Sequence, residues 1–219
     1  MMQSNNPWPG ARDASAGIDL STLTPGFADT VHDSQGVFRS LLDALSRPGK
    51  IVSIDAVMPT LTNQKQEKHV PLAAYAALLA LADYSTPVLL QHEHRSLSDA
   101  LRFHTGAPVT RECSEAVFAY LDDAFSMPSI DDFSLGEPET PETAAMLFIR
   151  VNSLTSGAPT TWRGPGIRES QTVCVEGVPA SFWDKRAQLA SDFPCGVDCY
   201  FVHGGSVIGL PRTTRVEVA

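Results

Sequence analysis

The chain has 219 residues, a formal net charge of −9, 43% hydrophobic residues and 19% charged residues. This length is enough for one domain with a substantial core, and the composition argues against wholesale disorder. The negative charge argues against an indiscriminate nucleic-acid binder and against a protein that binds anionic membranes. We therefore expect neither nucleic acid nor membrane among its partners.

The sequence lacks the patterns of a secreted or membrane-spanning protein. No basic segment followed by an apolar segment opens the chain, as a signal peptide would require. The longest apolar run, residues 70–82, is too short to span a bilayer. The cysteines have neither the density of a disulfide scaffold nor the second ligand pair of a structural zinc site: Cys113, Cys174, Cys195 and Cys199. We expect a cytoplasmic protein with reduced thiols and no bound metal.

The N-terminal part of the chain divides into an arm and a helix. Residues 1–28 mix Asn, Pro, Gly, Ser and Asp without a period, which predicts an extended arm. Apolar residues then recur at helical spacing. Asp33 or Ser34 can cap this helix, and Pro48 with Gly49 ends it.

Strands and helices alternate through the middle of the chain. A helix from Pro71 to about Asp83 is apolar almost all round, so we expect it to be buried against a sheet. A second helix is expected to end at Gly106. The predicted segments, in order, are a strand at 50–57, a strand at 87–92, a helix at 97–104 and a strand at 116–121.

The C-terminal half is less regular and closes on a hairpin. Gly204-Gly205 lies between two apolar runs, which predicts strands at 200–203 and 207–210 joined by a tight turn, and Pro211 ends the second strand. The segments before the hairpin are an irregular stretch at 122–142, a strand at 144–151, a loop at 154–168, a strand at 171–176 and a helix at 180–189.

The order of these elements predicts the fold class. Strands alternate with helices in the first half, and hairpin-linked strands close the chain. This mixture indicates a three-layer α/β/α sandwich with a mixed sheet. No internal repeat and no low-complexity linker interrupts the chain, so we expect residues 29–219 to form a single α/β domain after the arm at 1–28.

The strongest candidate for anion binding follows the hairpin. Arg212, Thr213, Thr214 and Arg215 place two guanidinium groups and two hydroxyls within four residues. Such a group can hold a phosphate or a carboxylate through paired hydrogen bonds. The alternative is the start of a strand, with Thr for its β propensity and Arg on the solvent face. Asp198 either caps local backbone or pairs with Arg212 across the hairpin.

A second candidate is the loop Trp162-Arg-Gly-Pro-Gly-Ile167. Gly164 and Gly166 permit close backbone approach to a ligand, and Arg163 and Arg168 flank them. The Gly-Lys-Ser/Thr of a phosphate-binding P-loop is missing. A simple connection between strands explains the loop as well as an anion-binding nest does.

Other charged groups give weaker indications. Arg102 and His104 either stabilise the negative end of a helix or face a substrate or partner. The pair His92 and His94 resembles part of a metal site but lacks a third ligand nearby. The run Asp122-Asp123 after a strand is either a cation ligand or a solvated turn. No Gly-x-Ser-x-Gly elbow marks a nucleophile.

Several stretches resemble one protein family in the same order. The C-terminal pair is Phe193-Pro-Cys-Gly-Val-Asp198 and Leu210-Pro-Arg-Thr-Thr-Arg-Val-Glu-Val218, and the others are Asp33-Ser-Gln-Gly-Val-Phe-Arg-Ser-Leu-Leu-Asp-Ala-Leu-Ser-Arg-Pro-Gly49, Leu81-Ala-Asp-Tyr-Ser-Thr-Pro-Val88, Ser98-Asp-Ala-Leu-Arg-Phe-His-Thr-Gly-Ala-Pro108 and Gly164-Pro-Gly-Ile167. They resemble the H subunit of the bacterial carbon–phosphorus lyase complex over about residues 27–218. Cys195 and Cys199 occupy variable positions of the C-terminal motif.

The resemblance implies a subunit of the carbon–phosphorus lyase core that acts in phosphonate catabolism. With its G, I and L partners, the family supports formation of α-D-ribose 1-methylphosphonate 5-triphosphate from ATP and methylphosphonate with loss of adenine. The implied partners of the chain are core subunits of the G, I and J types, with nucleotide or phosphonate as ligands to consider. The implied enzyme is a multi-subunit transferase, with no catalysis by this chain alone and no catalytic residue carried over.

The resemblance also implies the fold of the large domain of pyridoxal-phosphate-dependent transferases, without the cofactor. None of the four lysines, Lys50, Lys65, Lys68 and Lys185, stands at a strand end in a plausible pocket loop. We therefore expect no cofactor. The alternatives are a non-catalytic interaction subunit and a stand-alone degenerate transferase of the pyridoxal fold. We also expect a homodimer of the isolated chain.

Overall fold

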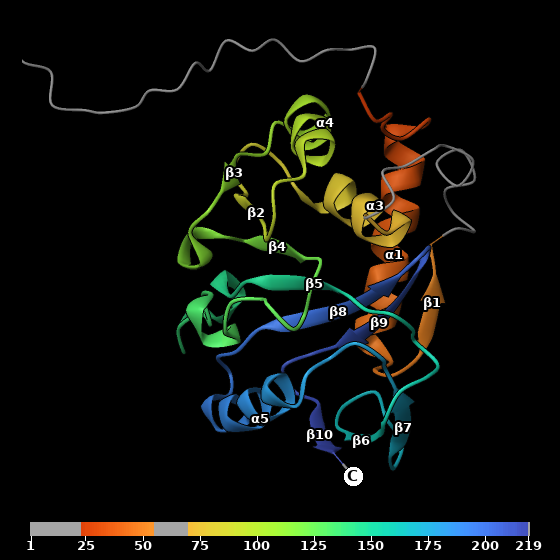
Figure 1. The fold of residues 1–219 in the computed structure, drawn as a ribbon, viewed down its shortest axis with the longest axis vertical. Coiled ribbons are helices and arrows are strands. Elements are labelled where there is room, and N and C mark those ends of the chain that lie inside the picture. Colours follow the sequence, from red (N-terminus) through yellow and green to blue (C-terminus); the bar gives the residue numbers. More distant parts are fainter. Residues whose placement is uncertain (1–22, 55–69, 219) are drawn as a thin grey trace, which may run out of the picture.

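A computed structural model describes residues 23–54 and 70–218 of the chain (Figure 1). Seven strands form one sheet in the order β1-β9-β8-β5-β4-β2-β3, and three strands form a second sheet in the order β10-β6-β7. The strands are β1 Ile51–Ser53, β2 Val88–Leu90, β3 Val109–Thr110, β4 Phe118–Leu121, β5 Met146–Arg150, β6 Pro159–Arg163, β7 Gln171–Cys174, β8 Asp198–His203, β9 Ser206–Leu210 and β10 Arg215–Val218. The α-helices are α1 Thr30–Ser46, α3 Leu72–Leu81, α4 Arg95–Thr105 and α5 Ala180–Leu189.

The large sheet is mixed, which confirms the predicted class. Strands β3, β2, β4, β5 and β8 run parallel to one another, β9 is antiparallel to β8, and β1 is antiparallel to β9. No helix among the described residues is long and apolar enough to cross a membrane.

Three helices, α1, α3 and α4, cover one face of the large sheet (Figure 1). They bury alternate side chains of the central strands, because successive residues of a strand point to opposite faces. The ring of Phe148 on β5 stacks on Tyr200 of β8 with centroids 5.2 Å apart. The Tyr200 hydroxyl donates to the carbonyl of Leu41 at 3.0 Å, which fixes α1 on this face.

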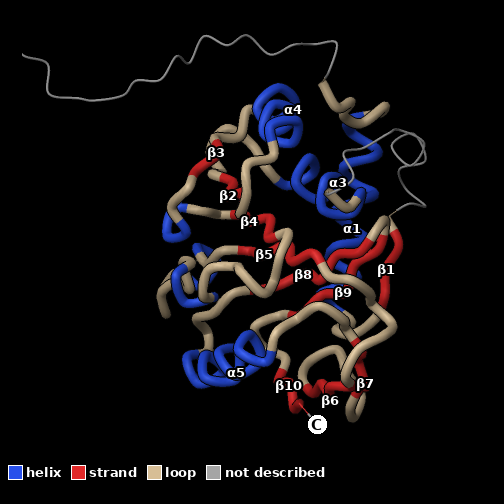
Figure 2. Tube along the Cα trace, viewed as in Figure 1, coloured by secondary structure: helices blue, strands red, loops and turns tan. Residues whose placement is uncertain are grey.

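The opposite face is covered by α5, the small sheet and the segment after β4 (Figures 1 and 2). Phe201 of β8 packs against Trp162 of β6 and against Phe182 and Trp183 of α5, with ring centroids 5.6 to 6.3 Å apart. Trp162 is fully buried, and its indole N–H donates to the Thr160 hydroxyl at 2.8 Å. This third layer therefore combines a helix and a sheet, instead of the helices alone that the sandwich prediction implied.

Helices α1 and α3 show how the sequence sets the first layer. The residues of α3 are apolar on every side, and Leu72 through Leu79 are buried, as predicted. Helix α1 begins at Thr30, before both residues that were expected to cap it, because Asp29 caps it. The Asp29 carboxylate accepts the backbone N–H groups of Val31 and His32 at 3.1 and 3.0 Å. The prediction of Asp33 or Ser34 as the cap was therefore wrong, and Asp33 lies inside the first turn.

Two strands lie where none was predicted, and several of the predicted strands are shorter than expected. Strand β6 lies inside the segment 154–168 that was predicted to be a loop, and it pairs with both β10 and β7. Its β-branched Thr residues and buried Trp162 favour a strand, but the nearby Gly and Pro residues obscured this pattern. Strand β3 has only two residues. Strand β7 ends at Cys174, and β1 spans 51–53, while residues 55–57 lie outside the described part, as does most of the predicted arm.

The predicted hairpin is present, with β8 and β9 joined at Gly204-Gly205. Gly204 has a φ of 55°, which a tight two-residue turn requires of its first central residue. Gly209, inside β9, is needed for a different reason. A Cβ atom at Gly209 would lie 2.5 Å from the carbonyl oxygen of Ala44 in α1, so α1 can approach β9 only where the strand has no side chain.

We predict that Gly209→Ala destabilises the fold by roughly 3 kcal/mol or more, because the added methyl group overlaps main-chain atoms that cannot rotate away. The matched control is Gly204→Ala, where nothing lies within 4 Å of the added Cβ atom. Only the left-handed backbone opposes alanine there, at a cost of about 1–2 kcal/mol. Urea denaturation of both variants measures the difference, and equal losses would contradict the proposed contact with α1.

Candidate functional site

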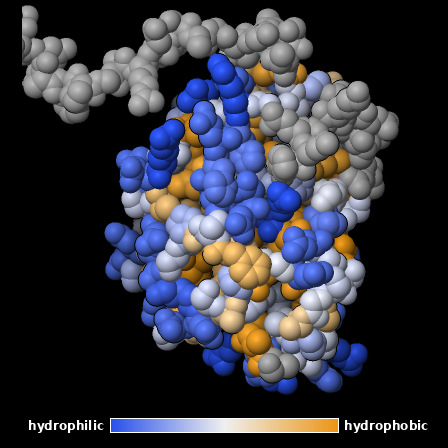
Figure 3. Space-filling view, viewed as in Figure 1, coloured by the Kyte–Doolittle hydropathy of each residue, from blue (hydrophilic) through white to orange (hydrophobic). Residues whose placement is uncertain are grey.

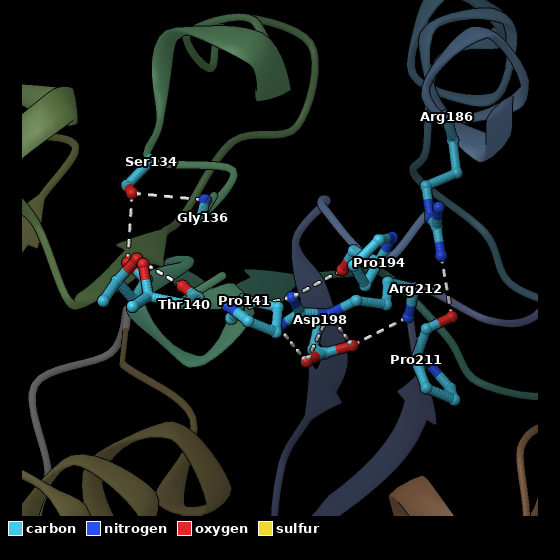
Figure 4. A network of polar contacts seen from close by, with 10 residues as sticks. Ser134, Gly136, Thr140, Pro141, Arg186, Pro194, Asp198, Pro211 and Arg212 are labelled. Atoms are coloured by element: carbon cyan, nitrogen blue, oxygen red, sulfur yellow. Dashed lines mark hydrogen bonds and ion pairs between the residues drawn. The ribbon is translucent and has the colours of Figure 1, made fainter. Parts of the chain in front are cut away.

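Arg212 and Asp198 form the centre of a polar network at the start of β8 (Figure 4). The Asp198 carboxylate accepts the backbone N–H of Arg212 at 2.7 Å, its Nη2 at 2.8 Å and its Nε at 3.2 Å. Nη1 donates to the carbonyls of Pro141 at 2.7 Å and Pro194 at 3.3 Å. The two charged side chains are 16% and 19% exposed. All three guanidinium nitrogens of Arg212 therefore have partners within the chain.

A second arginine, Arg186 of α5, contacts the same turn (Figure 4). Its Nη2 donates to the carbonyl of Pro211 at 2.7 Å, and this carbonyl also accepts the Thr214 N–H at 2.9 Å. Arg186 is 3% exposed, and burial lowers the pKa of its guanidinium. Sequence reasoning missed Arg186, because one Arg in a helix of mixed composition does not indicate that its side chain is buried.

The glycine loop packs against this turn from β6. A Cβ atom at Gly164 would lie 3.0 Å from the carbonyl oxygen of Thr213, and one at Gly166 would lie 2.2 Å from that of Ser46. Both glycines therefore allow close contacts within the chain. Arg163 forms an exposed ion pair with Glu217 of β10, with Nη1 2.8 Å from Oε1. The structure thus brings the loop together with the Arg212 turn.

Arg102 and His104 lie apart from this network, at the end of α4 on the other side of the large sheet (Figure 1). Gly106 caps the helix in the left-handed conformation, as predicted. The imidazole Nε2 of His104 lies 3.0 Å from the carbonyl oxygen of Thr24, which places the segment before α1 on α4. Arg102 is exposed.

A second group of charged residues lies where β2 and β4 end. His92 Nδ1 lies 2.6 Å from Asp122 Oδ1, and His94 Nε2 lies 2.9 Å from Asp122 Oδ2. Burial raises the pKa of Asp122, but the hydrogen bonds from His92 and His94 outweigh it, so the pKa lies below its usual value. The carboxylate is therefore ionised at neutral pH, and each imidazole donates a hydrogen bond to it.

The two groups occupy opposite edges of the large sheet. Strands β5 and β8 are parallel and in register, with Met146 beside Asp198 at their beginnings and Arg150 beside Val202 at their ends. The Arg212 network therefore lies at the amino edge, and the His92–Asp122–His94 group lies at the carboxyl edge. The sequence does not show that these histidines and Asp122 lie together, because they meet only through the pairing of β2 with β4.

Comparisons with known proteins assign the chain to a family. The model of the bacterial phosphonate metabolism protein PhnH matches residues 25–217. The chain belongs to this family. The match confirms the resemblance found over about residues 27–218, including its C-terminal motif.

Two relatives of the PhnH family match most of the chain. Alpha-D-ribose 1-methylphosphonate 5-triphosphate synthase subunit PhnH of Rhizobium meliloti (strain 1021) is 36% identical over 195 residues, which cover 87% of this chain and 94% of that protein. HtxG of Stutzerimonas stutzeri, named as a candidate C-P lyase subunit, is 30% identical over 184 residues, which cover 84% and 86%.

We predict that Arg212→Lys lowers the free energy of unfolding by about 1–3 kcal/mol, because lysine keeps the charge but cannot donate to Asp198, Pro141 and Pro194 together. The matched control is Arg163→Lys, which changes an exposed ion pair with Glu217 and should cost less than about 0.5 kcal/mol. Denaturant unfolding of the two variants tests this difference. A wild-type midpoint for Arg212→Lys would show that the network contributes little to stability.

Proposed function

We propose that the chain is a subunit of a carbon–phosphorus lyase core complex in the catabolism of organic phosphonates. In this role it supports formation of α-D-ribose 1-methylphosphonate 5-triphosphate from ATP and methylphosphonate. The observation that carries the proposal is the similarity to the PhnH subunit of Rhizobium meliloti along nearly its whole length. Its partners in this proposal are core subunits of the G, I and J types, and its location is the cytoplasm.

Within such a complex, two roles differ in chemistry. An interaction subunit contributes surface, whereas a contributing subunit places side chains in a shared active site. The amino-edge network favours the first role for Arg212, because its guanidinium nitrogens are bound to Asp198 and to two carbonyls. The carboxyl edge favours the second role, because His92 is 56% exposed there beside an ionised carboxylate.

We propose a fold related to the large domain of pyridoxal-phosphate-dependent transferases, without the cofactor. Lys50 and Lys185 form ion pairs with Asp43 and Asp131, with Nζ–O distances of 2.8 and 2.7 Å. Lys65 and Lys68 lie outside the described residues. The described lysines therefore offer no amine suited to a Schiff base in a closed pocket, and a stand-alone transferase is the weaker proposal.

Growth on methylphosphonate tests the proposed function. In a host that lacks its own H subunit, we predict that the full chain restores growth with methylphosphonate as the phosphorus source and co-purifies with the host's core subunits. Growth on phosphate is the control, because it does not require phosphonate cleavage. Co-purification without growth would support an interaction role alone, and failure of both would refute the subunit assignment for that complex.

The proposed homodimer of the isolated chain needs an apolar contact surface. Helix α3 does not supply it, because its apolar residues are buried in the core. The face in Figure 3 shows mostly hydrophilic residues with hydrophobic ones in small separate patches. Helix α1, however, exposes Val31, Phe38 and Leu42, whose spacing places them on one side of the helix. Ile51 of the edge strand β1 is also exposed.

We predict that the isolated chain sediments as a dimer at micromolar concentration and that Phe38→Glu shifts it to a monomer, because a buried charge opposes the apolar contact. Phe125→Glu is the matched control, since Phe125 is 71% exposed in the segment after β4. A monomeric wild-type chain, or dimers of both variants, would exclude the α1 surface as the contact.

A further inference from the structure

The side of the large sheet on which the chain adds its next strand changes between β2 and β4. These two strands are neighbours, although β3 comes between them in the sequence. From β2 the chain passes through α4 to β3 on one side, and from β4 it passes through residues 122–145 to β5 on the other side. The two connections also cover opposite faces, because α4 packs in the first core and the segment after β4 packs in the second.

Such a reversal is called a topological switch point. In open α/β sheets, ligands bind outside the carboxyl ends of the two strands at this point, because the two connections separate there. His92 and His94 lie in the short segment between β2 and α4, and Asp122 follows β4 directly. The charged group at the carboxyl edge therefore lies at the topological switch point of the sheet.

The hydrogen bonds of this group hold one imidazole toward solvent. His94 is 9% exposed and packs on the Tyr120 ring with centroids 5.7 Å apart. His92 is 56% exposed, and its Nδ1 is bound to the Asp122 carboxylate, which is only 13% exposed. Since the ionised carboxylate only accepts, His92 carries its proton on Nδ1 and keeps the lone pair of Nε2. The Asp122 carboxylate therefore fixes which ring nitrogen of His92 remains for another partner.

Asp122 and Asp123, the two aspartates that follow β4, already accept hydrogen bonds from donors of the chain. Both oxygens of Asp122 accept from the histidines. Both oxygens of Asp123 also accept, one from the Phe125 N–H at 3.0 Å and one from the Ser126 hydroxyl at 2.7 Å. No group of three His, Cys, Asp or Glu side chains in the described ranges could hold a metal ion. These two aspartates are therefore poorly suited to bind a cation.

The cationic side chains near this switch point favour an anion instead. Arg95 is exposed directly after His94, and Arg150 ends β5 beside β4. Arg150 is hydrogen-bonded to the Tyr120 side chain, which also contacts the His94 ring. Glu93 is the exposed carboxylate on the same loop.

We propose that the switch point between β2 and β4 binds a phosphoryl or phosphonyl oxyanion, with His92 donating to it from a protonated Nε2. The proposal deepens the proposed function, since its ligand class is the one on which a carbon–phosphorus lyase acts. Asp122 is the positioning residue, because it holds both imidazoles without contacting the ligand. The ligand binds His92 in its imidazolium form, so binding takes up a proton from solvent when His92 is neutral beforehand.

Titration calorimetry of the full chain tests the site with three probes: inorganic phosphate, methylphosphonate and ATP. We predict that at least one probe binds more tightly at pH 6 than at pH 8, because His92 can donate to both Asp122 and an oxyanion only when both of its ring nitrogens carry a proton. His92→Gln should weaken binding at pH 6 by about fivefold to tenfold and abolish proton uptake, measured in buffers of different ionisation enthalpy. Binding of methylphosphonate alone or of ATP alone identifies which phosphorus group the site recognises.

The matched control is His32→Gln. His32 also pairs with an aspartate, Asp29, at 2.8 Å, but it is 81% exposed and lies on α1. Unchanged binding by this variant, with loss in His92→Gln, supports the proposal. Equal affinities of His92→Gln and wild type, or no binding by either the isolated chain or its assembled complex, would overturn it. A chain that restores growth on methylphosphonate without binding any probe refutes the site and leaves the subunit assignment intact.

Discussion

The ion pair of Asp198 and Arg212 fixes the point at which the chain leaves the large sheet. Strand β9 ends at Leu210, and β10 begins five residues later in the small sheet. Between them, Arg212 is bound to the first residue of β8 and to the carbonyls of Pro141 and Pro194. One guanidinium thus joins the hairpin, the segment before β5 and the loop after α5. The position of the small sheet over the second core depends on this junction.

The cost of burying charge explains why all the guanidinium nitrogens of Arg212 are hydrogen-bonded at this junction. Removing two charges from water is costly, and their mutual attraction offsets this cost only when the remaining donors also find acceptors. Arg212 meets this condition, because its third nitrogen donates to backbone carbonyls. Arg186 does so less completely, since its buried Nε and the buried Thr214 hydroxyl have no partner among the described residues. The junction is therefore held mainly by Arg212, with Arg186 fixing the carbonyl of Pro211.

Local sequence signals predicted the elements better than they predicted their arrangement. The apolar composition of α3, the Gly106 cap and the Gly204-Gly205 hairpin each follow from properties of a few adjacent residues, and the structure has all three. The pairing of β2 with β4 and the burial of Arg186 depend on residues far apart in the chain. No periodicity encodes such contacts. Candidate residues could therefore be named from the sequence, but their grouping at two opposite edges required the fold.

The two edges differ in what their charges can still do. At the amino edge, the charge of Arg212 is matched by Asp198, and the glycines of the neighbouring loop are required by main-chain contacts. At the carboxyl edge, Asp122 is bonded through both oxygens, yet each imidazole retains a second nitrogen. Groups bound wholly within the chain stabilise one conformation, whereas a half-exposed imidazole can still exchange a proton or a ligand. The proposed binding site and the Arg212 network thus lie at opposite ends of the same parallel strands, a separation that α/β proteins use widely.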